Sequence, residues 1–263
     1  MTPVGIGPRD VVSLARHART TGTATGPILV RGILADKLAA ELRAGADPGG
    51  ASLVQTHGDP ADAVALVCVV AGPATPADEA DFRSATRALV PVIAVQTRDS
   101  SVSLPYVLAT DVVDCEPGRG FPVPGIARAL AAALGRDAAG LSASLPVLRD
   151  AVQNRRVVDG ALAAGALAMG KEERQLPLLV LAQARMLSEV SVADGRPAPE
   201  SPRATAEAVG SALAASLATG LAARTLVRHL PMRARVLDGA VAAGATLGLA
   251  AAFRRLDRAF RRR

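Results

Sequence analysis

Short apolar runs alternate with helical segments through the first half of the chain. Five runs have the apolar character of strands, and they are residues 27–30, 51–56, 62–72, 91–97 and 106–118. Segments with helical character lie between these runs, at 35–46 and from Thr75-Pro76 to about Leu89, and a third follows the last run at about 124–134. Such alternation is typical of a parallel sheet covered by crossover helices. The pattern predicts an α/β domain over residues 27–140, preceded by a helix and linker over residues 1–26.

Residues 62–72 form the most apolar of these runs. Their nearly continuous apolar sequence predicts a central strand that is buried on both faces of the sheet. Asp78 and Glu79 fall in the first turn of the helix that follows, where the helix dipole favours negative charge. Arg31-Gly32 and residues 47–50 are interpreted as turns that separate neighbouring elements.

No strand pattern follows Gly140. The remaining sequence predicts an all-α domain over residues 141–263, with helices near 145–170, 177–194, 202–228 and 233–260. Glycine and proline mark the breaks between these helices, at residues 170–177, at 195–199 and at Pro231.

Charge divides the chain in the same way as the pattern of elements. Residues 1–150 carry 13 basic and 15 acidic side chains, a net charge of −2, whereas residues 151–263 carry 17 and 9, a net charge of +8. The second half therefore favours an anionic partner, either nucleic acid or an anionic membrane surface. Since only four Phe and one Tyr are available for base stacking, we expect the membrane and not nucleic acid.

Residues that commonly carry catalysis or bind metals are sparse and scattered. Cys68 and Cys115 have no CxxC or Cys/His cluster near them, and the three histidines lie in separate segments, at His17, His57 and His229. We predict reduced, inert thiols, no metal site and no cofactor. The first 25 residues lack the apolar region of a secretory signal, which predicts a cytoplasmic start.

The end of the first strand lies where a P-loop protein would bind phosphate. A P-loop reads GxxxxGK[ST], and its amides, lysine and hydroxyl hold the phosphates and Mg²⁺. Here the stretch from Arg31 to Lys37 reads RGILADK, with no second glycine, no hydroxyl after Lys37, and a carboxylate at Asp36. The sequence argues against a phosphate cradle, and Gly32 and Lys37 are the candidates for any residual contact.

Three later segments, in the same order, resemble an eroded Era-type or Ras-type GTPase domain. DAVALVCVVAG resembles the strand after the switch regions, PVIAVQTRD the strand that ends in the guanine-reading NKxD, and DCEPGRGFPVPGIARALAAAL the approach to the last helix. Of the base-reading set only Asp99 is kept, and Gln96 and Thr97 replace the Asn and Lys. The resemblance implies a degenerate P-loop GTPase-like domain, with Asp99 as the candidate base-reading residue.

The helical half resembles the YcjF-like domain of bacteria. The resemblance rests on a helix with Gln183 and Met186, a small-residue helix over 208–231, and a final run around Thr246 and Gly248. It implies a domain attached behind a GTPase domain or its relic, in proteins that are often associated with the inner membrane.

Two helical stretches, 208–227 and 236–253, are near the minimum length of a membrane span. Their alanine-rich and glycine-rich composition makes insertion marginal, and Gly244-xxx-Gly248 suits close helix contacts, including those of a homo-oligomer. A two-span hairpin would place strongly basic flanks on both sides of the membrane, so we expect peripheral or shallowly inserted association with the cytoplasmic leaflet. The predicted membrane contacts are Arg254, Arg255, Arg258, Arg261, Arg262 and Arg263.

Three functions fit this sequence. The leading hypothesis is a non-enzymatic pseudo-GTPase that docks a GTPase or another protein partner at the cytoplasmic membrane face. A second is an unconventional nucleotide-binding protein or hydrolase that uses the strand ends near Gly32, Gly72 and Asp99. A third is a soluble helical interaction module.

Overall fold

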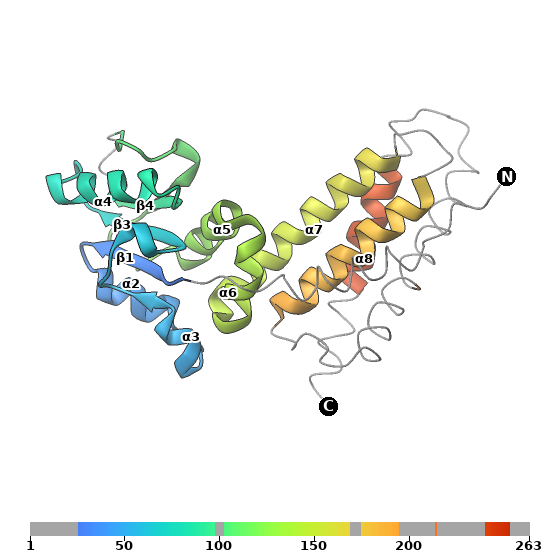
Figure 1. The fold of residues 1–263 in the computed structure, drawn as a ribbon, viewed down its shortest axis with the longest axis horizontal. Helices are drawn as coiled ribbons and strands as arrows, with labels where there is room; N and C mark the ends of the chain where they lie inside the picture. The colour runs from blue at the N-terminus through green and yellow to red at the C-terminus, as the bar shows by residue number, and fades with distance from the viewer. Residues whose placement is uncertain (1–25, 98–102, 169–174, 195–213, 215–239, 253–263) are drawn as a thin grey trace. The chain divides into compact units, whose positions relative to one another are not determined.

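The computed structural model describes residues 26–97, 103–168, 175–194, 214 and 240–252 (Figure 1). Contacts within the chain divide it into two units. The α/β unit is Gly22–Val152 with Ala193–Gly195, and the helical unit includes Gln153–Val192 and residues 240–252. The division falls inside a long helix, beyond the boundary at residue 140 that the sequence suggested.

Five parallel strands form the sheet of the α/β unit, which confirms the predicted architecture. Their order is β2-β1-β3-β4-β5, and every neighbouring pair is parallel. Val30 of β1 lies opposite Val67 of β3, and Val67 lies opposite Ile93 of β4. The strands are β1 (Ile28–Gly32), β2 (Val54–Gln55), β3 (Ala65–Val70), β4 (Val92–Thr97) and β5 (Val112–Cys115).

The central strand β3 is buried along its whole length, as its sequence predicts. Successive side chains of a strand point to opposite faces of the sheet. Leu66, Cys68 and Val70 accordingly join one core cluster, which also contains Phe82 and Ala85 of helix α4 (Pro76–Arg87). The sheet therefore needs helices on both faces.

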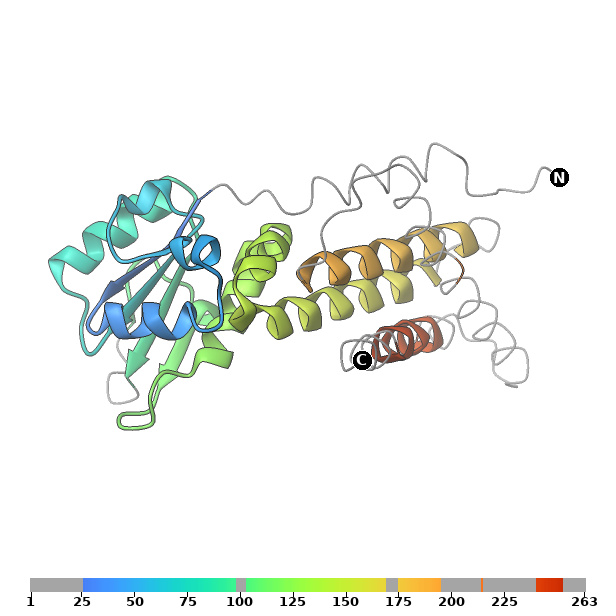
Figure 2. The same ribbon diagram turned by 90° about the horizontal axis from the view of Figure 1, so that it is seen from below.

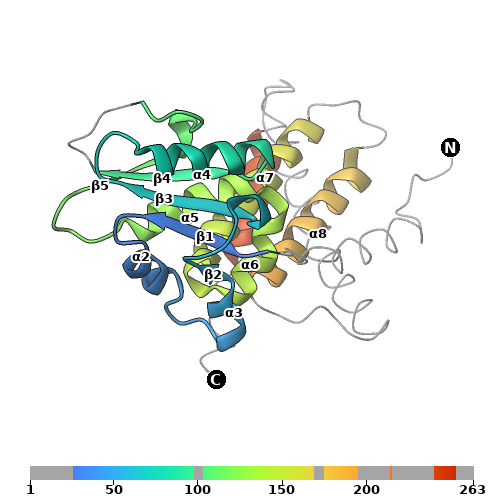
Figure 3. The ribbon, with the colours of Figure 1, turned by 60° about the vertical axis from the view of Figure 1, so that its left-hand side comes forward.

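Helices cover both faces of the sheet (Figure 3). Helix α4 and the short turn η1 (Pro60–Asp62) lie on one face, and α2 (Ala35–Leu42) and α5 (Val123–Leu134) lie on the other. The smaller helical elements of the unit are α3 (Pro48–Ser52), η2 (Ala109–Asp111), η3 (Gly135–Asp137) and α6 (Ala138–Ser144).

The start of α4, which the sequence places at Thr75-Pro76, has a reciprocal capping arrangement. Thr75 accepts a hydrogen bond from the Asp78 amide at 3.2 Å, and the Thr75 amide donates to Asp78 Oδ2 at 2.9 Å. This reciprocal pair satisfies two amides of the first turn, which have no partner within the helix.

Some element boundaries differ from those that the sequence predicts. Residues 48–52 form helix α3, so the predicted strand 51–56 shrinks to β2. The cause is local, because Asp47 caps this helix by accepting from the Gly50 amide at 2.6 Å, with Pro48 at its first position. Arg31 and Gly32 belong to β1 and not to a turn. The strand predicted over 106–118 is confined to β5.

The helical unit is built around two long helices, α7 (Pro146–Ala168) and α8 (Gln175–Ala193), which lie side by side (Figures 1 and 2). Residues 240–252 form a third helix. Val157 of α7, Met186 and Val190 of α8, and Ala250 of the third helix share one buried cluster. The helix predicted over 202–228 lies outside the described residues except at position 214.

Candidate functional site

The strand order creates one position where a ligand site is expected. In doubly wound sheets, ligands bind outside the carboxyl ends of the strands, where the chain connections leave in opposite directions. Here the chain leaves β1 toward β2 on one side, and it leaves β3 toward β4 on the other. The candidate site, which we call the switch point, is therefore formed by the turns after Gly32 and Val70.

The turn at the β1 side of the switch point is short and closed. Only Ile33 and Leu34 separate β1 from α2, and their side chains are 56% and 60% exposed. The Ile33 amide donates to the Val69 carbonyl of β3 at 3.1 Å. This turn thus uses the Ile33 amide within the protein and presents two apolar side chains to solvent, so that amide is not available to a phosphate.

Gly32 closes the turn against β3. Its φ angle is +87°, and an ideal Cβ placed on it would lie 2.1 Å from the Val69 carbonyl oxygen. Glycine is thus required by both backbone conformation and space. The close approach joins β1 to β3 and leaves no room between Gly32 and Val69 for a ligand atom.

Two of the candidate nucleotide residues, Gly32 and Gly72, lie at or just after the ends of adjacent strands at the switch point, whereas Lys37 lies in α2. Gly32 ends β1, and Lys37 lies exposed in the first turn of α2. Asp99 lies outside the described residues. Gly72, the third position of the nucleotide-binding hypothesis, follows β3, and no atom lies within 4 Å of a Cβ built on it.

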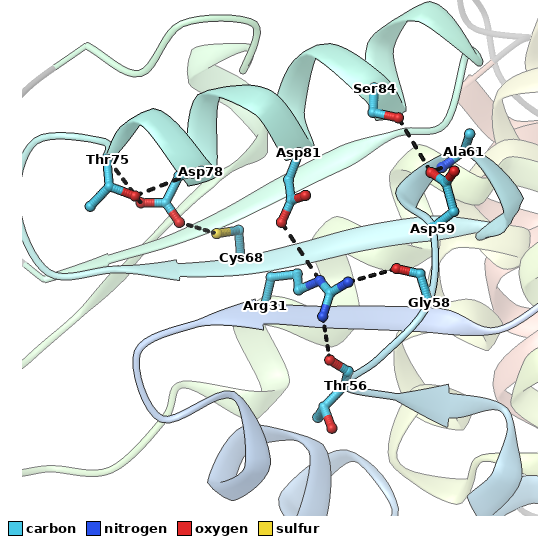
Figure 4. Close-up of polar contacts among 10 residues, drawn as sticks. All are labelled: Arg31, Thr56, Gly58, Asp59, Ala61, Cys68, Thr75, Asp78, Asp81 and Ser84. Atoms are coloured by element: carbon cyan, nitrogen blue, oxygen red, sulfur yellow. Dashed lines mark hydrogen bonds and ion pairs between the residues drawn. The ribbon is translucent and has the colours of Figure 1, made fainter.

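Arg31 is the residue at this edge that sequence reasoning missed. Its guanidinium donates to the carbonyls of Thr56, at 2.5 Å from Nη1, and Gly58, at 2.6 Å from Nη2 (Figure 4). Nε lies 3.6 Å from Asp81 Oδ2 on α4. Arg31 therefore ties the turn after β2 and helix α4 to β1. The sequence signal that could have found this role is the alternation of side chains along β1, which puts Arg31 on the same face of the sheet as Leu29.

The side chains next to Arg31 have perturbed ionisation. Burial raises the pKa of the Asp81 carboxyl, the Arg31 cation opposes that rise, and the charges of Asp78 and Asp59 add to it. Burial also raises the pKa of the Cys68 thiol well above its ordinary value. The Asp78 carboxylate adds to this shift through its charge and through a hydrogen bond of 3.7 Å from Sγ to Oδ1.

The raised pKa of the Cys68 thiol argues against nucleophilic chemistry at this residue. A reactive cysteine needs a lowered pKa and access to solvent, and Cys68 has neither. Among the described residues, no group of three or more His, Cys, Asp or Glu side chains is arranged to hold a metal ion. Arg31 and its neighbours form a polar clamp that fixes the fold around the switch point.

The helical unit contains a second polar cluster, in its interior. Gln183 Nε2 donates to Thr246 Oγ1 at 2.8 Å, and Thr246 donates to the Ala242 carbonyl at 2.9 Å. Gln183, Met186 and Thr246, on which the YcjF-like resemblance rests, are all buried between helices. Gly160 of α7 permits this packing, since a Cβ on it would lie 2.6 Å from Met186 Sδ.

An ion pair lies in the same interior. Arg156 Nε of α7 is 3.5 Å from Glu189 Oε2 of α8, and the two side chains are only 7% and 9% exposed. Arg185 Nε contacts the other oxygen of Glu189 at 3.0 Å. Glu189 is therefore the carboxylate that both guanidinium groups share.

The predicted membrane contacts, from Arg254 to Arg263, lie outside the described residues. Within the described part of the chain, none of the helices combines the length and apolarity needed to cross a bilayer.

Comparisons with known proteins found no matching family model, no matching curated protein and no matching solved structure. The GTPase-like and YcjF-like resemblances accordingly stay predictions.

Proposed function

We propose that this chain is a non-enzymatic scaffold, a degenerate GTPase-like domain that docks partner proteins and is held at the cytoplasmic membrane face by its helical C-terminal half. The observation that carries the proposal is the closed turn after β1. The Val69 carbonyl occupies the space beside Gly32 and accepts the Ile33 amide, so the end of β1 offers a triphosphate neither room nor the Ile33 donor, and Asp36 places a carboxylate in the first turn of α2.

The cation nearest to the switch point on β1 supports the same proposal. Arg31 directs its guanidinium into the protein, toward two carbonyls and Asp81. Phosphoryl-transfer sites rely on cations that face the phosphates. In this α/β unit, that charge stabilises the position of α4 instead.

The membrane part of the proposal rests on charge. Residues 151–263 carry the net charge of +8, and the arginines of the C-terminal end can each contribute about 1 kcal/mol of attraction to an anionic leaflet. Such attraction falls as salt screens it.

Membrane association is tested by expressing the full chain and a form that lacks residues 233–263, and by fractionating both at low and high salt. We expect the full chain in the membrane fraction at low salt and its release at high salt, with the shortened form soluble throughout. Because the truncation also removes helix 240–252, a full-length variant with Arg254, Arg255 and Arg258 changed to Gln serves as the milder comparison. Equal solubility of all three proteins would contradict this part of the proposal.

The alternative function, a nucleotide-binding protein or hydrolase, is supported by the position of the switch point, which is where doubly wound sheets commonly bind ligands. It requires binding of GTP, GDP or ATP, whereas the scaffold proposal requires none. Nucleotide affinity therefore distinguishes the two.

A further inference from the structure

The outer surface of α4 has an open groove on its C-terminal half. The groove has a volume of about 490 Å³ and lies between α4 and the turn η1. We call it the α4 groove, and its lining residues are Ala61, Ala80, Arg83, Ser84, Arg87 and Ala88. It lies on the opposite face of the sheet from α2, and it is separate from the switch point.

Two arginines make the α4 side of this groove basic, whereas on the η1 side the Asp59 carboxylate is occupied by the Ala61 amide and the Ser84 hydroxyl. Arg83 and Arg87 are one helical turn apart and both exposed, so they lie on the same face of α4. Among the described residues, neither has a carboxylate or carbonyl partner. By contrast, other arginines of the α/β unit do bond to such oxygens, namely Arg31, Arg43, Arg119 and Arg128.

Two exposed side chains add apolar surface near the end of α4 and beside Arg83. Leu89 follows the end of α4 and is 91% exposed. Tyr106 is 53% exposed, and its ring centroid lies 5.9 Å from Cζ of Arg83. Arginine and tyrosine beside an apolar side chain are typical of the residues that carry binding energy at protein interfaces.

From this arrangement we infer that the α4 groove docks an acidic, amphipathic segment of a partner protein. Carboxylates one helical turn apart would meet Arg83 and Arg87, and an apolar side chain of the segment would contact Tyr106 beside Arg83 or Leu89 after the end of α4. The inference rests on the proposed scaffold role and names the chemistry of its partner. A bilayer fits less well, because binding to a flat anionic surface depends on many basic side chains, whereas this groove offers two.

The test uses the full-length chain and a displayed library of random 16-residue peptides. Selected peptides are synthesised, and their dissociation constants are measured by fluorescence anisotropy at fixed salt. We expect selection to enrich peptides with two acidic residues spaced three or four apart next to a large apolar residue. The double variant R83E/R87E should weaken their binding about tenfold or more, since both charge-assisted contacts become repulsive.

The matched control is R119E/R128E, which makes the same change in net charge at two exposed arginines outside the groove. It should bind the selected peptides with nearly unchanged affinity, and L89A should weaken them by a smaller factor than R83E/R87E. Far-ultraviolet circular dichroism and melting curves establish that each variant is folded. Failure to enrich acidic peptides, or equal binding by R83E/R87E and the wild type, would overturn the inference.

A second arm tests the membrane as the occupant. Vesicles of phosphatidylcholine alone and with phosphatidylglycerol are compared for binding to the wild type and R83E/R87E. If the double variant loses vesicle binding and no peptide is selected, the groove is a membrane contact and protein docking is wrong. Nucleotide binding at the switch point would contradict the scaffold role, whatever the α4 groove binds. Failure of the scaffold proposal can therefore be distinguished from failure of the groove inference.

Discussion

Replacing Gly32 with Ala is expected to lower the free energy of unfolding of the α/β unit by about 3 kcal/mol or more. The new Cβ would lie 2.1 Å from the Val69 carbonyl oxygen, a backbone atom held in the β1–β3 pairing, and φ at Gly32 is +87°. An L side chain at this φ costs roughly 1 to 2 kcal/mol, and the displaced strand pairing adds the rest. Urea unfolding followed by circular dichroism measures the change.

Two other glycines separate the causes of this effect. Gly118 has a φ of +83° with no atom within 4 Å of an added Cβ, so Gly118→Ala reports the cost of conformation alone. Gly72 has open space and a φ outside the left-handed range, so Gly72→Ala should change stability by less than about 0.5 kcal/mol. If Gly32→Ala were no more harmful than Gly118→Ala, the close contact with Val69 would not hold the turn.

Replacing Glu189 with Leu should destabilise the helical unit by about 3 kcal/mol or more. The change leaves the Arg156 guanidinium, which is only 7% exposed, without the carboxylate that lies 3.5 Å from it. Removing a close counter-charge from a buried cation takes away attraction that offsets the desolvation cost of the cation. The measurement is the loss of helical circular dichroism with urea.

The reciprocal change is expected to be milder. Arg156→Met removes the buried cation, while Glu189 keeps Arg185, which lies 3.0 Å away. Asp159→Leu breaks the Arg155–Asp159 pair, whose side chains are 52% and 42% exposed, and this control should cost less than about 1 kcal/mol. A Glu189→Leu variant as stable as Asp159→Leu would show that the buried pair does not set the packing of α7 on α8.

The sheet was predictable because its strands carry their own signals. The apolar run of β3 indicates burial on both faces, and the helix predicted to begin at Thr75-Pro76 with two acidic residues in its first turn is α4. Helix α3 was missed since residues 51–56 also have strand propensity, and the cap formed by Asp47 decided the competition. Secondary-structure propensities do not include such a side-chain hydrogen bond, because it depends on the local geometry of the folded chain.

The candidate site was less predictable than the sheet. The absent P-loop residues are visible in the sequence, but the contact between Gly32 and Val69 depends on how β1 pairs with β3. Arg31 was assigned to a turn, and its partners Thr56 and Gly58 are 25 and 27 residues away. The bond from Gln183 to Thr246 joins residues 63 positions apart. Pairings over such separations follow from tertiary packing and not from local pattern.

The central claim is that the switch point does not grip a nucleotide triphosphate. Isothermal titration calorimetry of the full chain with GTP, GDP and ATP, with and without Mg²⁺, tests it most directly. The scaffold account predicts no saturable heat with any of the three at millimolar ligand, in either condition. Saturable, Mg²⁺-dependent binding at micromolar concentration, weakened by Lys37→Ala, would contradict the account and establish the chain as a nucleotide-binding protein.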